Sequence, residues 1–204
     1  MYTEIVMELQ TFIIMGRSGS GKGTQAELLQ KYIQSNDKAN RSIFYLEIGG
    51  QFRNFISQGN YTAKLSREVM KTGDLQPPFL AVHIWSHVMI QQMDEGKHLI
   101  ADGTPRIVEE AKMLDSAMRF YQRENPTIIY IDVSRKWSED RLHGRGRADD
   151  VAAGVIKRRL DWFDADVLPT IEYLKANPLY RFLTVNGEQS IEDVHKELIE
   201  KAFN

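Results

Sequence analysis

The sequence predicts an α/β protein in which helices cover both faces of a parallel sheet of about five strands. Short apolar runs alternate with longer stretches of helical periodicity over most of the 204 residues. Near-continuously apolar runs are typical of strands buried on both faces, and strands that alternate with helices form parallel sheets with right-handed crossovers. A glycine-rich turn directly follows the first apolar run. Together these features predict one three-layer α/β/α domain.

We expect the strands at residues 10–15, 43–48, 98–101, 127–132 and 181–185. Periodicity predicts helices near residues 22–34, 50–58, 61–72, 77–94, 107–123, 135–143, 151–175 and 190–203. Two segments break the alternation: three successive helices between residues 49 and 94, and a glycine–arginine turn at 143–150. Excursions of this kind, beyond the carboxyl ends of parallel strands, are where α/β proteins cover their ligands.

The composition excludes several classes of protein. The hydrophobic fraction of 42% and the charged fraction of 26% are those of an ordinary globular domain, and a net charge of −2 gives no general affinity for polyanions. The chain has no cysteine, which excludes disulfides and thiolate chemistry and fits a reducing cytoplasm. It has no apolar run of about 18 residues and no basic start, so we expect neither a membrane span nor an export signal. We expect a cytoplasmic protein, and we also expect it to act as a monomer.

The strongest signal of function is the turn GRSGSGKGTQ at residues 16–25, between the first strand and the first helix. Glycines let backbone N–H groups point inward, the helix N-terminus adds its positive dipole, and Lys22 supplies a mobile charge. The glycine and lysine spacing fits a phosphate-binding loop, although Gly23 stands where most such loops carry Ser or Thr. The hydroxyl comes one place later. We expect the polyphosphate of a nucleotide to bind to Gly19, Ser20, Gly21, Lys22, Gly23 and Thr24.

A second segment, HLIADGTPR at residues 98–106, places a carboxylate and an arginine at the end of a buried strand. Asp102 is expected near the mouth of the phosphate loop, where it can hold Mg²⁺ through water, because Mg²⁺ dehydrates reluctantly. Arg106 would project a bidentate donor toward the same crevice. The structural alternative is that Asp102 caps the next helix.

The loop sequence GKGTQ resembles that of the adenylate kinase family of nucleoside monophosphate kinases, which carries Pro in place of Ser18. The segment DGTPR is similar to the strand-end motif of the same family, in which Phe or Tyr is more usual than Thr104. The resemblance covers nearly the whole chain. It implies a P-loop NTPase fold with a helical acceptor-binding excursion at 49–76 and a short lid at 143–150. The implied reaction is reversible γ-phosphoryl transfer from Mg²⁺·ATP to a nucleoside monophosphate.

The resemblance also implies where the acceptor monophosphate binds. The segment GGQFR at 49–53 resembles the family's Thr-Gly-Asp-x-x-Arg motif, with Ile48 and Gly50 replacing the Thr and the Asp. The segment GDLQ at 73–76 resembles the turn whose backbone meets the acceptor base. By this resemblance, the acceptor-binding residues are Gly49, Arg53, Gln76, Gly103, Arg106 and Glu110.

The acceptor base is left open by Glu110, which stands where the family usually carries Gln. A carboxamide can donate to adenine N1 and accept from its N6 amine, whereas an ionised carboxylate only accepts. A carboxylate would instead suit the N–H donors of guanine. AMP is favoured by the family, with GMP or another base as the alternative.

The turn RLHGRGRADD at 141–150 carries three arginines whose planar guanidinium groups can clamp phosphate oxygens. The resemblance implies that Arg141 stacks on the donor base and that Arg145 and Arg147 clamp phosphates. It assigns the next catalytic arginine to Arg159, with Arg158 as the alternative. Nearby acids and the lack of an aromatic platform argue against a nucleic-acid site.

Near the end of the chain, the segment TVNGE at 184–188 resembles the family's loop against the donor adenine, which implies that Gly187 lies there. The resemblance thus implies the catalytic set Lys22, Arg106, Arg145, Arg147 and Arg159.

Two other functions fit the phosphate loop. One is a non-catalytic nucleotide-binding module of the same fold, against which the presence of Lys22, Asp102, Arg106 and Arg145 argues. The other is an NTPase switch that uses water as the acceptor, for which we identify no water-activating residue.

Overall fold

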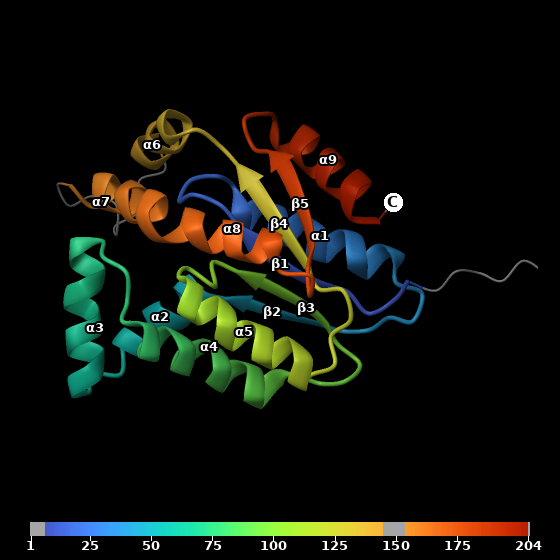
Figure 1. Ribbon diagram of the computed structural model, residues 1–204, viewed down its shortest axis with the longest axis horizontal. Helices are drawn as coiled ribbons and strands as arrows, with labels where there is room; N and C mark the ends of the chain where they lie inside the picture. Colours follow the sequence, from blue (N-terminus) through green and yellow to red (C-terminus); the bar gives the residue numbers. More distant parts are fainter. Residues whose placement is uncertain (1–6, 145–153, 204) are drawn as a thin grey trace, which may run out of the picture.

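The structure is a computed structural model that describes residues 7–144 and 154–203. In this part of the chain, one sheet of parallel strands runs through the centre of the molecule (Figure 1). The strands are β1 (Thr11–Met15), β2 (Ile43–Glu47), β3 (His98–Asp102), β4 (Thr127–Asp132) and β5 (Arg181–Asn186), in the spatial order β2-β3-β1-β4-β5. The predicted three-layer α/β fold is confirmed.

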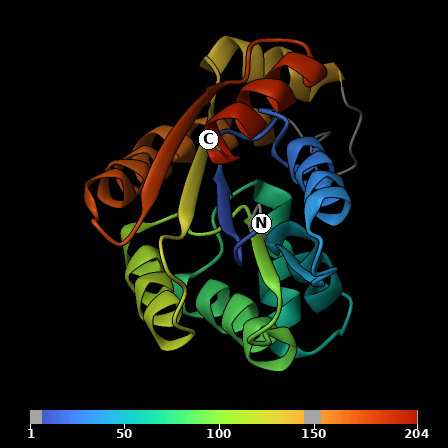
Figure 2. The same ribbon diagram turned by 90° about the vertical axis from the view of Figure 1, so that its right-hand side faces the viewer.

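Helices cover both faces of the sheet, as Figures 1 and 2 show. They are α1 (Lys22–Asn36), α2 (Ile48–Ile56), α3 (Tyr61–Thr72), α4 (Pro78–Gln92), α5 (Val108–Phe120), α6 (Arg135–Gly144), α7 (Val155–Trp162), α8 (Leu168–Ala176) and α9 (Ile191–Phe203). Helices α1 and α9 lie on one face, and α4, α5 and α8 lie on the other. Among the described residues, no helix has the length and apolar character needed to cross a bilayer.

The central strands β1 and β3 are buried along their whole length, which explains why they are apolar at successive positions. Because side chains alternate across a strand, Phe12 and Ile14 of β1 pack under α1 and α9. Ile13 and Met15 pack with α4, α5 and α8 on the other face. One strand therefore contributes to two separate apolar layers.

The carboxyl ends of the strands meet at one edge of the sheet, and this edge carries the predicted motifs. In the strand register, Asp102 of β3 pairs with Ile14 of β1 on one side and with Glu47 of β2 on the other. The phosphate loop follows β1 directly. The second strand ends one residue earlier than predicted, because Ile48 already belongs to α2.

The predicted helix at 151–175 is interrupted. Between α7 and α8, the segment Phe163–Val167 forms a π-helical turn. Such a turn holds one additional residue, so it rotates the side chains that follow relative to those that precede it. Phe163 and Val167 are both buried in the core.

Candidate active site

The phosphate loop joins β1 to α1 and is pressed against β4 and α6. A Cβ built on Gly16 would lie 2.6 Å from the carbonyl oxygen of Ile131, so only glycine fits there. Gly19 has a φ of 86°, in the region that favours glycine, and its Cβ would lie 3.0 Å from the Ser138 carbonyl oxygen. The loop sequence is therefore set by close backbone contacts as well as by phosphate chemistry.

Lys22 begins α1 and folds back across the loop. Its Nζ donates hydrogen bonds of 2.8 Å to the carbonyl oxygens of Gly16 and Arg17. These bonds keep the ammonium group at the N-terminus of α1, where backbone N–H groups and the helix dipole attract anions.

Arg17 anchors the loop to the π-helical turn, which the sequence did not predict. Its Nη1 lies 2.5 Å from Asp164 Oδ1, and its Cζ lies 4.3 Å from the centre of the Phe163 ring. Its Nε donates to the Val133 carbonyl oxygen at 3.2 Å. The one signal for this role in the sequence was that Arg17 lies inside a glycine-rich loop. Its partners lie at least 116 residues later in the chain, so the contacts could not be predicted.

Asp102 lies at the end of β3, beside the phosphate loop. Burial raises the pKa of its carboxyl group, Lys22 and Arg106 lower it, and the nearby Glu47 charge raises it. The nearest atom to a Cβ built on Gly23 would be Asp102 Oδ2, at 3.8 Å. The position where most phosphate loops carry Ser or Thr therefore faces this carboxylate.

The two arginines predicted for the acceptor lie on the same side of the sheet as Lys22. Arg106 Nε donates to the Gly103 carbonyl oxygen at 2.9 Å, and its guanidinium carbon lies 5.4 Å from the centre of the Trp162 ring. Burial lowers the pKa of Arg106. Arg53 projects from α2, and its Nη2 lies 3.1 Å from Glu47 Oε2.

A single cavity of about 710 Å³ joins the two groups of residues. This volume lies within the range of pockets that hold small-molecule ligands, about 300–1,000 Å³. The predicted site residues that line the cavity are Gly19, Ser20, Gly21, Lys22, Gly23, Thr24, Gly49, Arg53, Gln76, Asp102, Gly103, Arg106, Arg141, Arg159 and Gly187.

Several predicted residues line the cavity in ways that the sequence did not indicate. Gln76 is buried, and both ends of its amide group hydrogen-bond to Ser66. Nε2 donates to the Ser66 carbonyl oxygen at 3.0 Å, and Oε1 accepts from the Ser66 hydroxyl at 2.9 Å. Arg141 lies over the Trp137 ring at 5.3 Å. Gly187 has no room for a side chain, because a Cβ would lie 2.5 Å from Val133 Cγ1.

Glu110 does not line the cavity in this structure. It is 4% exposed, its Oε2 accepts from the Arg106 backbone N–H at 2.9 Å, and burial raises the pKa of its carboxyl group. The Arg106 N–H and charge and the Thr104 hydroxyl act in the opposite direction and lower this pKa. A carboxylate in the first turn of α5 thus binds the backbone just before that helix, and its role in base recognition stays a prediction.

The two candidate arginines in α7 have different surroundings. Arg159 lines the cavity, whereas Arg158 Nη1 lies 2.9 Å from Asp74 Oδ2 in an ion pair. This placement favours Arg159 as the site residue. Arg145 and Arg147 lie outside the described residues.

Trp162 lines the cavity and was not predicted. Its Nε1 donates to the carbonyl oxygen of Gly73 at 2.9 Å. The indole ring therefore connects the C-terminal end of α7 to the turn that follows α3. A tryptophan late in a helix gives no sequence signal for such a contact.

The fold and the cavity define a class of protein: a P-loop α/β protein whose phosphate loop lines one cavity together with Arg53 and Arg106. The sequence model of the adenylate kinase family matches residues 14–178.

Named relatives match most of the chain. The adenylate kinase of Corynebacterium urealyticum is 30% identical over 182 residues, which cover 89% of this chain and 93% of the relative. The adenylate kinase of Leptospira biflexa is 30% identical over 196 residues, covering 94% and 98%. That of Petrotoga mobilis is 26% identical over 224 residues, covering 94% and 98%.

The chain belongs to the adenylate kinase family. It is accordingly a nucleoside monophosphate kinase, a phosphotransferase that uses a phosphate group as the acceptor.

Proposed function

We propose that the protein reversibly transfers the γ-phosphoryl group of Mg²⁺·ATP to a nucleoside monophosphate, with AMP as the favoured acceptor. The observation that carries the proposal is the shared cavity, which Lys22, Arg53 and Arg106 all line. Two phosphate groups bound to these residues would meet inside one cavity. The relatives' name, adenylate kinase, supports ATP and AMP as the substrates.

The proposed chemistry depends on positioning and charge. Lys22 and the backbone N–H groups of the loop bind the donor phosphates, while Arg53 and Arg106 bind the acceptor phosphate. Preorganised cations stabilise the charge that spreads over the transferring group, and holding both reactants in line removes much of the entropic barrier. No strong general base is needed, because the attacking phosphate is already an anion.

The oxygen donors at this edge of the sheet suit Mg²⁺, which prefers carboxylates, phosphates and water. Asp102 ends β3 and lines the cavity. No group of three or more potential His, Cys, Asp or Glu ligands occurs in the described part of the chain. Asp102 would hold Mg²⁺ through water, and the ion would neutralise phosphate charge.

We further propose that residues 49–76 form the acceptor-binding excursion and that 143–150 form the short lid. Arg145 and Arg147 would clamp phosphates from this lid, and Arg159 would act from α7. That the protein works as a cytoplasmic monomer stays a prediction from the composition.

The proposal is tested by incubating the protein with Mg²⁺·ATP and AMP, GMP, CMP, UMP or dTMP, and following the diphosphate product. AMP is expected to give the highest kcat/KM, and a preference for GMP would favour the Glu110 alternative. Lys22→Ala is expected to lower kcat by about 10²- to 10³-fold without unfolding the protein, because it removes one preorganised cation. Lys31→Ala, on the exposed side of the same helix, is the matched control. Inorganic phosphate without diphosphate would contradict the proposal.

A further inference from the structure

Glu47 lines the cavity at the end of β2, where it immediately precedes α2. Both of its carboxylate oxygens lie 3.1 Å from Arg53 Nη2. The Nε and Nη1 groups of the arginine are not engaged by Glu47. The carboxylate thus contacts the guanidinium group through Nη2 alone, which leaves the N–H groups of Nε and Nη1 to a further anion.

Two glycines in the first turn of α2 make room for this carboxylate. A Cβ built on Gly49 would lie 2.8 Å from Glu47 Oε1, and a Cβ on Gly50 would lie 2.3 Å from Oε2. Neither glycine has a positive φ, so the backbone conformation does not require glycine at either position. Each glycine disfavours a helix by about 1 kcal/mol relative to alanine. A side chain at either position would push the Glu47 carboxylate out of the place that it occupies here.

The position of Arg53 needs a neighbouring anion. Its Nη1 would lie 3.2 Å from a Cβ on Gly49, so the guanidinium group folds back over the first turn of α2. A cation is unfavourable at a helix N-terminus, where the helix dipole is positive. Glu47 supplies the negative charge that offsets this repulsion.

We propose that Glu47 is a positioning residue that holds Arg53 toward the acceptor phosphate. Its carboxylate occupies the space that Gly49 and Gly50 leave free, which we call the carboxylate site. The inference rests on the proposed function, in which Arg53 binds that phosphate. The resembling family motif carries Asp where this chain has Gly50. Here the carboxylate comes from the strand end, and its Oε2 lies within 2.3 Å of where a residue-50 side chain would begin.

The test is a double-mutant cycle with AMP as the acceptor, at saturating Mg²⁺·ATP. Glu47→Ala removes the carboxylate, and Gly50→Ala displaces it, because the new methyl group occupies the carboxylate site. Each is expected to raise the KM for AMP about fivefold, the loss expected for one partly exposed ion pair, with a smaller change in kcat. The variant with both changes is expected to be no worse than Glu47→Ala, because no carboxylate remains to be displaced.

A rescue variant separates positioning from structural damage. Glu47→Ala combined with Gly50→Asp returns a carboxylate to the carboxylate site, now from a residue of α2. The KM for AMP should then return to within about twofold of wild type. Gly50→Ala alone should not lower the midpoint of thermal unfolding, because alanine favours the helix. A purely structural role for Glu47 would not give this pattern.

Three outcomes would overturn the inference: an unchanged or lower KM for AMP in Glu47→Ala, additive losses in the cycle, or no recovery in the rescue variant. Calorimetric titration with AMP gives the same comparison without turnover. If wild type forms no diphosphate from any monophosphate, the proposed function fails, and the titration still decides whether Glu47 supports anion binding by Arg53.

Discussion

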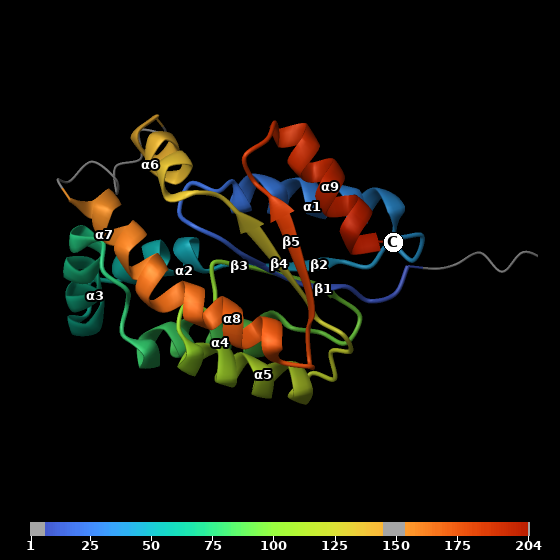
Figure 3. The same cartoon turned by 45° about the horizontal axis from the view of Figure 1, so that its top comes forward.

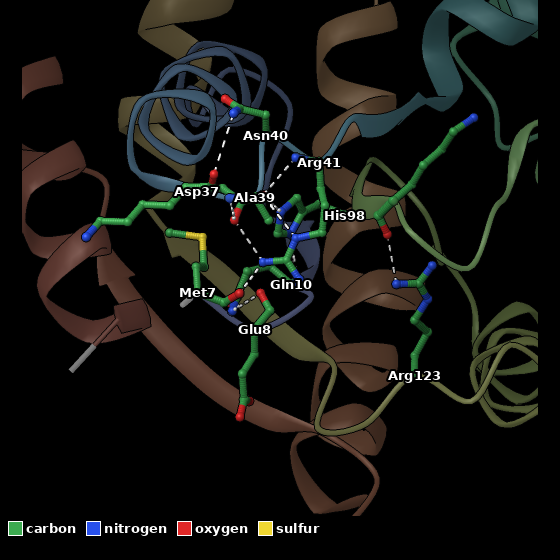
Figure 4. Close-up of polar contacts among 11 residues, drawn as sticks. Met7, Glu8, Gln10, Asp37, Ala39, Asn40, Arg41, His98 and Arg123 are labelled. Atoms are coloured by element: carbon green, nitrogen blue, oxygen red, sulfur yellow. Dashed lines mark hydrogen bonds and ion pairs between the residues drawn. The ribbon is translucent and has the colours of Figure 1, made fainter. Parts of the chain in front are cut away.

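His98 is fully buried at the start of β3, at the opposite end of that strand from Asp102, with both ring nitrogens hydrogen-bonded (Figure 4). The Gln10 backbone N–H donates to Nδ1 at 2.9 Å, so the proton lies on Nε2, which is 3.2 Å from Asp37 Oδ2. Arg41 also binds Asp37, with Nη2 2.8 Å from Oδ1. The ring is therefore held neutral between a backbone donor and a carboxylate.

The charges around His98 set how its protonation affects stability. Burial and the Arg41 and Arg123 charges lower the pKa of His98 from its ordinary 6.5, against the opposing effect of Asp37. The Arg41 hydrogen bonds hold the pKa of Asp37 far below 3.8. The unfolded chain then binds more protons than the folded one below about pH 6.5, and more again below about pH 4.

We predict that the free energy of unfolding falls on acidification below about pH 6.5, with a slope of at most about 1.4 kcal/mol per pH unit from His98. His98→Gln keeps a donor for Asp37 but cannot be protonated, so it should remove this contribution. His195, whose pKa burial also lowers, should still contribute, and the Asp37 loss below about pH 4 should remain. Urea unfolding from pH 4.5 to 8 measures the slope. Identical slopes in the two proteins would contradict the assignment.

At the scale of elements, the phosphate loop is supported by a helix that is distant in the sequence. Arg17 contacts Asp164 and Phe163, which the π-helical turn carries. Arg135 binds the same Asp164 through its other oxygen, with Nη1 at 2.7 Å. The family's Pro in the loop is replaced here by Ser18, and the Arg17 contacts give the loop an alternative restraint.

We therefore predict that Arg17→Ala lowers kcat/KM for ATP by about tenfold, because small displacements of phosphate-binding groups are costly in phosphoryl transfer. Arg135→Ala is the matched control: it also removes a contact to Asp164 but leaves the loop anchored, so its kcat/KM should stay near wild type. Steady-state kinetics with ATP varied measures both. Equal losses in the two variants would show that the network as a whole matters rather than the loop contact.

The strands and most helices could be predicted because burial produces a recognisable apolar pattern: continuous in strands covered on both faces, and periodic in helices. The π-helical turn could not, since Phe163 and Val167 satisfy ordinary helical spacing and the bulge depends on packing against other segments. The prediction extended β2 by one residue, to Ile48. This residue is apolar and buried, which fits a strand as well as the helix that it begins.

The candidate site was predicted in outline for a similar reason. Motifs at strand ends must meet in a parallel sheet, so Lys22, Asp102 and Arg106 could be placed together from their positions alone. Glu110 was placed by analogy with a glutamine, but its carboxylate accepts a hydrogen bond from the Arg106 backbone instead of lining the cavity. Glu47 was overlooked because its contacts depend on the space left by two glycines.

At the scale of the whole molecule, α3 and its following turn meet α7, as Figures 1 and 3 both show. The contacts between them include the Asp74–Arg158 ion pair, the Trp162 hydrogen bond to Gly73, and the packing of Val155 against Gly73. The Thr72 hydroxyl and Arg158 lower the pKa of Asp74, which keeps it charged. The acceptor side of the cavity is thus tied to the helix that carries Arg159.

We predict that Asp74→Asn raises the KM for AMP about threefold at low salt, because the acceptor side loses an exposed ion pair. The charge-exchanged variant Asp74→Arg with Arg158→Asp should recover most of the loss. Exposed ion pairs are screened by salt, so the difference from wild type should shrink in about 0.5 M NaCl. Steady-state kinetics at two salt concentrations checks this, and a loss that is insensitive to salt would exclude the ion pair as its cause.

The placement of the three tryptophans gives the molecule its own optical labels. Trp85 belongs to α4 and is buried in the core, Trp137 lies against Arg141 near the proposed donor side, and Trp162 hydrogen-bonds to the turn after α3 near the proposed acceptor side. Emission from the last two should report on each end of the cavity separately, with the first as an internal reference. Single-tryptophan variants would then let filling of either end be timed by stopped-flow fluorescence, without an attached dye.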